Sequence, residues 1–150
     1  MTSMAVIDEF LAQRSLAVVG VSRQQRKFGN KVYKDLTAKG YKVFAVNPNA
    51  REIDGKPCYP HLKDLPEPVG GVVLVIPPSE TSRVAHEAVE AGIFRIWMQQ
   101  GSESREAIEF CEKEGIDVIH GMCIMMFAEP VAHLHRFHRW LWRILGKVPK

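Results

Sequence analysis

The residues best suited to chemistry lie in a loop near the N-terminus that contains two glycines. Gly20 ends an apolar run, Ser22 follows it two positions later, and Gly29 precedes a helical segment. Glycines let a ligand approach the backbone closely, and a helix N-terminus favours a phosphate group. The loop is not a GxGxxG pattern, because Ser22 stands where the second glycine would be, so an ordinary turn with solvated cations explains it equally well. The basic residues of the loop are Arg23, Arg26 and Lys27.

The residues after the next apolar run bear on the kind of nucleotide. Folds that bind NAD usually place Asp or Glu here to hold the ribose 2′-hydroxyl, whereas this chain has Asn47-Pro48. The pair argues against NAD and suits a nucleotide with a phosphate on its ribose, provided that cations lie nearby. A simple turn is compatible with the same residues. The candidate cations are Lys42, Arg51 and Lys56.

A third segment, residues 69–76, is apolar throughout and ends at Pro77-Pro78. Two prolines remove two backbone donors and stiffen the chain. Such a wall suits an apolar ligand arm, although structural stiffening alone explains the pair equally well.

Short apolar runs alternate with helical segments along the chain, a pattern typical of βαβ units. Because the runs are apolar on both faces, they predict a parallel sheet with helices on either side. Right-handed crossovers then favour an α/β fold with a doubly wound, mainly parallel sheet of five or six strands and an extra C-terminal helix. The predicted strands cover 16–20, 41–46, 69–76, 93–98 and 116–119, with a short one near 58–59. The predicted helices cover 3–13 (capped by Ser3), 30–39, 80–91 (capped by Ser79), 104–114 and 130–145.

The composition predicts one globular domain over residues 1–150. Hydrophobic residues make up 46% of the chain and charged residues 25%, which excludes a disordered, collagen-like or coiled-coil protein. The sequence contains no apolar run of about 18 residues and no basic leader, so we expect neither a transmembrane helix nor a signal peptide. An odd number of cysteines without CxxC spacing favours reduced thiols in the cytoplasm.

The net charge of +3 is concentrated at the C-terminus. Residues 130–150 hold five basic and no acidic residues, whereas the other 129 hold 15 and 17. A nearly neutral body is unlike a domain that binds nucleic acid. The segment predicts an amphipathic helix whose arginines either cover the core or form a homo-oligomer contact. An acidic partner and an anionic membrane surface are the alternatives.

Candidate catalytic and metal-binding residues are few. His120 and Cys123 are close enough in sequence to form a thiolate–imidazole pair, but no third residue to orient them is identifiable. A buried structural cysteine is the commoner case. His133, His135 and His138 do not form a metal-binding pattern. We therefore assign no catalytic residue and no metal ligand.

Taken together, the motifs resemble the CoA-binding domain family in its small stand-alone form, which is similar to the CoA-binding part of the succinyl-CoA synthetase α subunit. The resemblance runs from about Leu11 to Cys123. It implies a Rossmann-like domain that binds coenzyme A or an acyl-CoA, without the domain that carries the synthetase's catalytic histidine. Met122 stands where many relatives have an arginine, so no role is carried over to it. The matching motifs include Ala17-Val-Val-Gly-Val-Ser22, Lys27-Phe-Gly-Asn30, Val46-Asn-Pro48 and Trp97-Met-Gln-Gln-Gly101.

The resemblance also implies a role for each strand end. Beside Gly20, the phosphates would be held by Val21, Ser22, Arg23 and Lys27, with Gly29 and Asn30 opening the helix beneath them. The adenosine and its 3′-phosphate would be bordered by Asn47, Pro48 and Asn49. The pantetheine arm would be flanked by Ile76, Pro77 and Pro78, and the next strand end would contribute Met98, Gln99 and Gln100.

We therefore expect a non-catalytic, cytoplasmic CoA-binding protein that acts as a carrier, sensor or regulatory module, with no nucleic-acid partner. Two alternatives stay open: a small NAD(P)- or acyl-CoA-dependent enzyme, and an interaction module that works through residues 130–150. The absence of an acid at position 47 and of a catalytic set argues against the enzyme.

Overall fold

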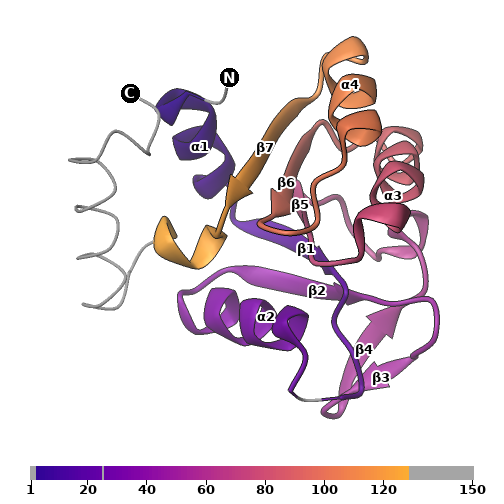
Figure 1. Ribbon diagram of the computed structural model, residues 1–150. Helices are drawn as coiled ribbons and strands as arrows, with labels where there is room; N and C mark the ends of the chain where they lie inside the picture. Colours follow the sequence, from indigo (N-terminus) through magenta and orange to yellow (C-terminus); the bar gives the residue numbers. More distant parts are fainter. Residues whose placement is uncertain (1–2, 25, 129–150) are drawn as a thin grey trace.

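The computed structural model describes residues 3–24 and 26–128 and contains a mostly parallel sheet between two layers of helices (Figure 1). The strands are β1 (Ser15–Val19), β2 (Lys42–Val46), β3 (Glu52–Ile53), β4 (Lys56–Tyr59), β5 (Gly71–Leu74), β6 (Arg95–Gln99) and β7 (Asp117–Met122). Their order is β3-β4-β2-β1-β5-β6-β7, and only β3 runs antiparallel to its neighbour. The α/β, doubly wound prediction is confirmed.

The predicted five or six strands correspond to the six parallel ones, and β3 adds a seventh within the described residues. A hairpin at Asp54-Gly55 produces it. Both residues have positive φ, 53° and 75°, as a two-residue hairpin turn requires.

The helices are α1 (Met4–Leu11), α2 (Phe28–Ala38), α3 (Pro78–Glu90) and α4 (Arg105–Lys113), and two short 3-10 turns are η1 (Leu62–Asp64) and η2 (Ile124–Met126). The Ser3 hydroxyl accepts a hydrogen bond from the Val6 N–H at 3.4 Å, which confirms the predicted cap. The cap predicted at Ser79 is wrong, because α3 already begins at Pro78 with Pro77 in the capping position. Proline suits the first turn of a helix, where its missing N–H costs nothing.

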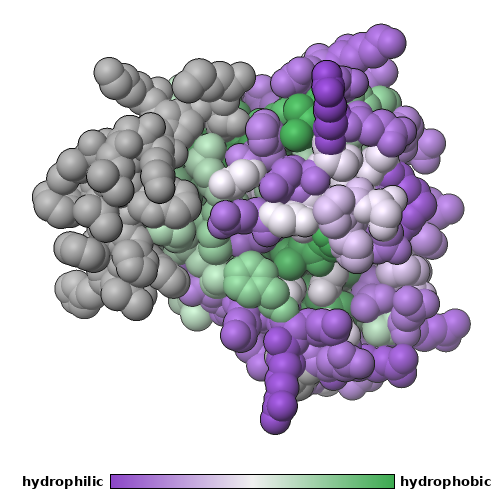
Figure 2. Space-filling model, viewed as in Figure 1, coloured by the Kyte–Doolittle hydropathy of each residue, from purple (hydrophilic) through white to green (hydrophobic). Residues whose placement is uncertain are grey.

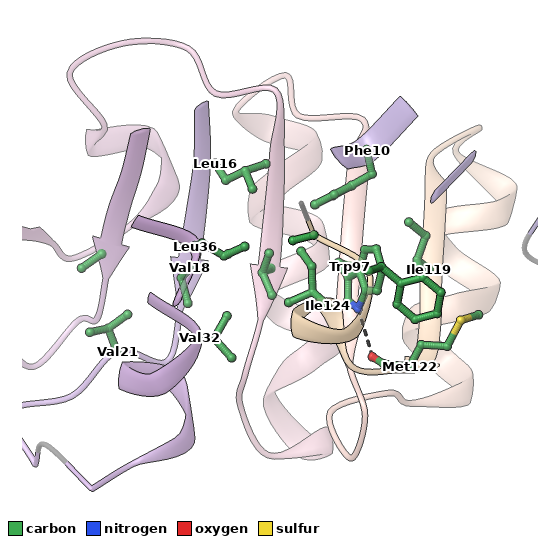
Figure 3. Close-up of a cluster of buried hydrophobic side chains, with 14 of the residues drawn as sticks. Phe10, Leu16, Val18, Val21, Val32, Leu36, Trp97, Ile119, Met122 and Ile124 are labelled. Atoms are coloured by element: carbon green, nitrogen blue, oxygen red, sulfur yellow. Dashed lines mark hydrogen bonds between the residues drawn. The ribbon is translucent and has the colours of Figure 1, made fainter. Parts of the chain in front are cut away.

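Two apolar cores cover the two faces of the sheet. Successive β1 side chains alternate between them: Leu16 and Val18 lie with α1, α2 and η2, whereas Ala17 and Val19 lie with α3, α4 and η1. In the first core, Trp97 is fully buried and donates its indole N–H to the Met122 carbonyl at 3.0 Å (Figure 3). Hydrophilic side chains cover most of the described surface on the face shown in Figure 2.

The strand order reverses at β1, although the strands on both sides of β1 run parallel to it. The segment after β1 leads to β2 on one side, whereas β5, on the other side of β1, leads on to β6 and β7 (Figure 1). This reversal places a crevice at the carboxyl ends of β1 and β5, where open α/β sheets bind their ligands.

None of the helices in residues 3–24 and 26–128 has the length and apolar character needed to cross a membrane. The predicted C-terminal helix and its three histidines lie outside the described residues.

Candidate functional site

A pocket of about 260 Å³ lies at the carboxyl ends of β1, β2 and β5. It therefore occupies the crevice at the reversal of strand order. Loops after these three strands line it, together with the first turns of α3. The lining residues are Val19, Gly20, Ser22, Lys27, Val46, Asn47, Pro48, Asn49, Val75, Ile76, Pro77, Glu80 and Arg83.

Two glycines bring backbone against backbone beneath the pocket. Gly20 has a φ of 114°, and a Cβ there would overlap the carbonyl oxygen of Val75. A Cβ on Gly29 would overlap the carbonyl oxygen of Gly20 in the same way. The first turn of α2 is therefore held directly against the end of β1, which only glycine at both positions allows.

The buried amide of Asn30 holds the shape of the first loop. Its Oδ1 accepts from the Ser22 N–H at 2.9 Å, and its Nδ2 donates to the Ser22 carbonyl at 2.7 Å. The side chain is only 1% exposed. Asn30 therefore positions Ser22, and both ends of its amide are already bonded to protein.

Asn47 ties the second loop to the first. Its Nδ2 donates to the Val21 carbonyl at 2.8 Å, and its Oδ1 accepts from the Asn49 N–H at 2.8 Å. A carboxylate could not make the first of these bonds, because it has no proton to donate. The geometry thus gives a structural reason for Asn at the position where NAD-binding folds carry an acid.

The end of β5 is tied to the loop after β6 through a residue that the sequence analysis missed. Ser102 accepts from the Ile76 N–H at 3.0 Å, and its carbonyl accepts from the Thr81 hydroxyl at 2.5 Å. Both Ser102 and Thr81 are buried. In the sequence, Ser102 could have been recognised as a small hydroxyl residue just after Gly101, at the end of a predicted strand.

The predicted residues at the end of β6 do not reach the pocket. Met98 is buried in the second core, and Gln100 is exposed outside the lining. Gln99 is buried, donates to the Cys123 sulfur at 2.9 Å and accepts from the Ile124 N–H at 3.0 Å. This strand end is therefore fastened to the segment after β7.

The other predicted residues divide between the pocket and its support. Val21 is buried in the same core as Val18 and Val32 (Figure 3). Its side chain does not line the pocket. Arg23 and Pro78 are exposed but do not line it. The predicted residues that do line it are Gly20, Ser22, Lys27, Asn47, Pro48, Asn49, Ile76 and Pro77.

The cations of the pocket differ from those expected beside the ribose. Lys42 begins β2 at its amino end and pairs with Glu67 at 2.8 Å, so its proposed place near a ribose phosphate is wrong. Arg51 and Lys56 are exposed and do not line the pocket. The two lining cations are Lys27 and Arg83, and the spacing of Pro77, Glu80 and Arg83 along a helix was the missed signal.

Two of the three cysteines in the described residues are buried, and the third lies outside the pocket lining. Burial raises the pKa of Cys111 to about 11 and also raises the pKa of Cys58, as expected of inert structural thiols. Cys123 is half-buried, free, and outside the pocket lining. Within residues 3–24 and 26–128, no three His, Cys, Asp or Glu side chains are grouped as a metal site would require.

The fold and crevice define a Rossmann-like domain. Residues 14–129 match the model of the CoA binding domain family, so this chain belongs to that family.

The acetate–CoA ligases that this chain matches are much longer than the chain itself. It is 31% identical over 134 residues to an ADP-forming acetate–CoA ligase of Archaeoglobus fulgidus, a match that covers 83% of this chain but spans only about a fifth (20%) of the ligase. The uncharacterised protein YneT of Bacillus subtilis is similar in size, with 33% identity over 81% of this chain and 91% of its own length.

The similar solved structures likewise include both a protein of similar size and a much longer enzyme. A conserved hypothetical protein from Pyrococcus furiosus is 46% identical, with a TM-score of 0.71 over 74% of this chain and 96% of its own. A dinucleotide-forming acetyl-coenzyme A synthetase from Candidatus Korarchaeum cryptofilum is 28% identical, with a TM-score of 0.62 over 70% of this chain but 25% of its own.

Proposed function

We propose that this chain binds coenzyme A or an acyl-CoA in the pocket at the carboxyl ends of β1, β2 and β5. One observation carries the proposal: Gly20 and Gly29 bring the first turn of α2 against a pocket that Lys27 lines. This arrangement combines helix N–H groups, a cation and a backbone without side chains, which together suit a phosphate group. Membership of the CoA binding domain family supports the choice of ligand.

The size of the pocket indicates how the ligand would lie. At about 260 Å³ it is slightly below the roughly 300–1,000 Å³ typical of small-molecule sites. It therefore suits part of coenzyme A, the nucleotide end, with the pantetheine arm extending past Ile76 and the exposed Pro77. An arm that leaves the pocket would accommodate acyl groups of different sizes.

The proposed role is non-catalytic: a carrier, sensor or regulatory module of the cytoplasm. The Cys123 sulfur accepts a hydrogen bond from the amide of Gln99, which is neither an acid nor a base. The pocket itself is lined by cations, amides, prolines, aliphatic side chains and the hydroxyl of Ser22, with Glu80 as its one acid among the described residues. This set suits binding better than proton transfer.

Replacing Lys27 with alanine is expected to weaken CoA binding about ten- to a hundredfold. A hydrogen bond to a charged group contributes about 1.5–3 kcal/mol, and each 1.4 kcal/mol changes affinity about tenfold. Lys27 is exposed, so the variant should keep the thermal stability of the wild type. Titration calorimetry with CoA measures the change.

Lys31→Ala is the matched control, because Lys31 is exposed in the first turns of α2, just after Lys27, but does not line the pocket. It removes the same charge and should change the affinity far less. Equal losses in the two variants would reduce the role of Lys27 to general electrostatics. A wild-type protein that does not bind CoA would overturn the proposed function.

A further inference from the structure

Arg83 is the cation that the α3 wall contributes to the pocket. Lys27 precedes α2 and Arg83 lies on α3, and these two helices cover opposite faces of the sheet (Figure 1). The two cations therefore approach the pocket from different sides. A ligand that carries phosphates at two separate positions would meet one cation at each.

Arg83 is held only loosely by protein. Its Nη1 lies 3.3 Å from Oε2 of Glu87, one turn further along α3, and its side chain is 52% exposed. Solvent-exposed pairs of this kind contribute little to stability. A ligand oxygen can thus replace Glu87 as the partner of the guanidinium at small cost.

Glu87 has a second partner that stays in place when Arg83 leaves. Its Oε1 lies 2.8 Å from Nδ1 of His61, which follows β4. The Glu87 side chain is 25% exposed, so water also reaches it. Release of Arg83 therefore leaves no buried carboxylate without a partner, which is the usual penalty for breaking an ion pair.

The position of Arg83 points to the ribose end of the ligand. The pocket that it lines also includes Asn47 and Asn49 after β2, the strand end that meets the ribose in folds of this kind. Arg51 and Lys56, the exposed cations near that strand end in the sequence, do not line the pocket. A guanidinium binds a terminal phosphate through two parallel N–H donors.

We propose that Arg83 exchanges Glu87 for the 3′-phosphate of the ribose and so determines the preference for CoA over ligands without that phosphate. The inference rests on the proposed function. Glu80 lines the same pocket one turn before Arg83, so a pocket without Arg83 would present an acid near the phosphate. This acid strengthens the dependence of 3′-phosphate binding on Arg83.

The test compares two ligands on three proteins by titration calorimetry. Wild type, Arg83→Ala and Arg105→Ala are each titrated with CoA and with dephospho-CoA, which lacks only the 3′-phosphate. Arg105 is the matched control, because it pairs with Glu109 four residues on at 3.0 Å and does not line the pocket. We expect Arg83→Ala to lose about ten- to a hundredfold in affinity for CoA and almost none for dephospho-CoA.

Equal losses for both ligands, or no loss for either, would overturn the role of Arg83 while leaving CoA binding intact. A wild-type protein that binds neither ligand would instead overturn the proposed function.

Glu87→Gln adds a test of the exchange itself. Because it removes the competing carboxylate, it should raise the affinity for CoA, and a decrease would contradict the exchange.

Discussion

Replacing Gly20 with alanine is expected to lower the free energy of unfolding by about 3 kcal/mol. A left-handed backbone costs an L-residue about 1–2 kcal/mol, and Gly20 has a φ of 114°. The new methyl group would also overlap the Val75 carbonyl, and forced overpacking adds about 1–3 kcal/mol. Chemical denaturation measures the loss.

Gly40→Ala separates these two causes. Gly40 has a similar φ of 99°, but a Cβ there meets nothing within 4 Å. Its variant should lose only the conformational part, about 1–2 kcal/mol. If the two variants were equally destabilised, the tight contact between the ends of β1 and β5 would have no energetic importance.

We also expect Gly20→Ala to bind CoA more weakly, because a shift of Gly20 displaces Gly29 and the start of α2.

Replacing Asn30 with alanine is expected to cost about 2–3 kcal/mol, because both hydrogen bonds to the Ser22 backbone are lost. The loop that carries Lys27 would then lose its defined shape, so CoA affinity should fall as well. Denaturation and calorimetry on the same variant measure the two effects. Unchanged stability would show that Asn30 does not hold the loop.

Asn30→Asp tests the same contact through the pH dependence of stability. The new carboxyl would face the Ser22 carbonyl oxygen, which accepts from Nδ2 at 2.7 Å in the native protein. Burial and this facing oxygen would raise the carboxyl pKa in the folded state. A raised folded pKa means that stability is retained at low pH and lost as pH rises through it. The variant should therefore be closer to wild type at about pH 4 than at about pH 8, and the opposite trend would contradict the geometry.

The fold was predictable from sequence because its signals are local. Apolar runs of strand length alternate with helices that are each followed closely by a glycine, Gly40, Gly92 or Gly115, and each of these glycines has positive φ. With helices predicted on both faces of the sheet, right-handed βαβ crossovers then favour a reversal of strand order. Helix starts were less certain, as α3 shows, since prolines fit the first turn of a helix as readily as they end a strand.

The lining of the candidate pocket was predictable where its residues directly follow a strand, as Gly20 and Ile76 do. Prediction failed where a side chain from another element decides the outcome. Lys42 is near Asn47 in sequence but lies at the opposite end of β2, whereas Arg83 reaches the pocket from a helix that follows another strand. The amide bonds of Asn47 to Val21 and Asn49 likewise depend on a contact between loops.

The central claim, that this pocket binds CoA, is tested most directly by titrating the wild-type protein with CoA, acetyl-CoA, dephospho-CoA and NAD. We predict that CoA and acetyl-CoA bind with similar affinity, that dephospho-CoA binds more weakly, and that NAD binds most weakly of the four. A preference for NAD, or the absence of binding by every CoA species, would contradict the account.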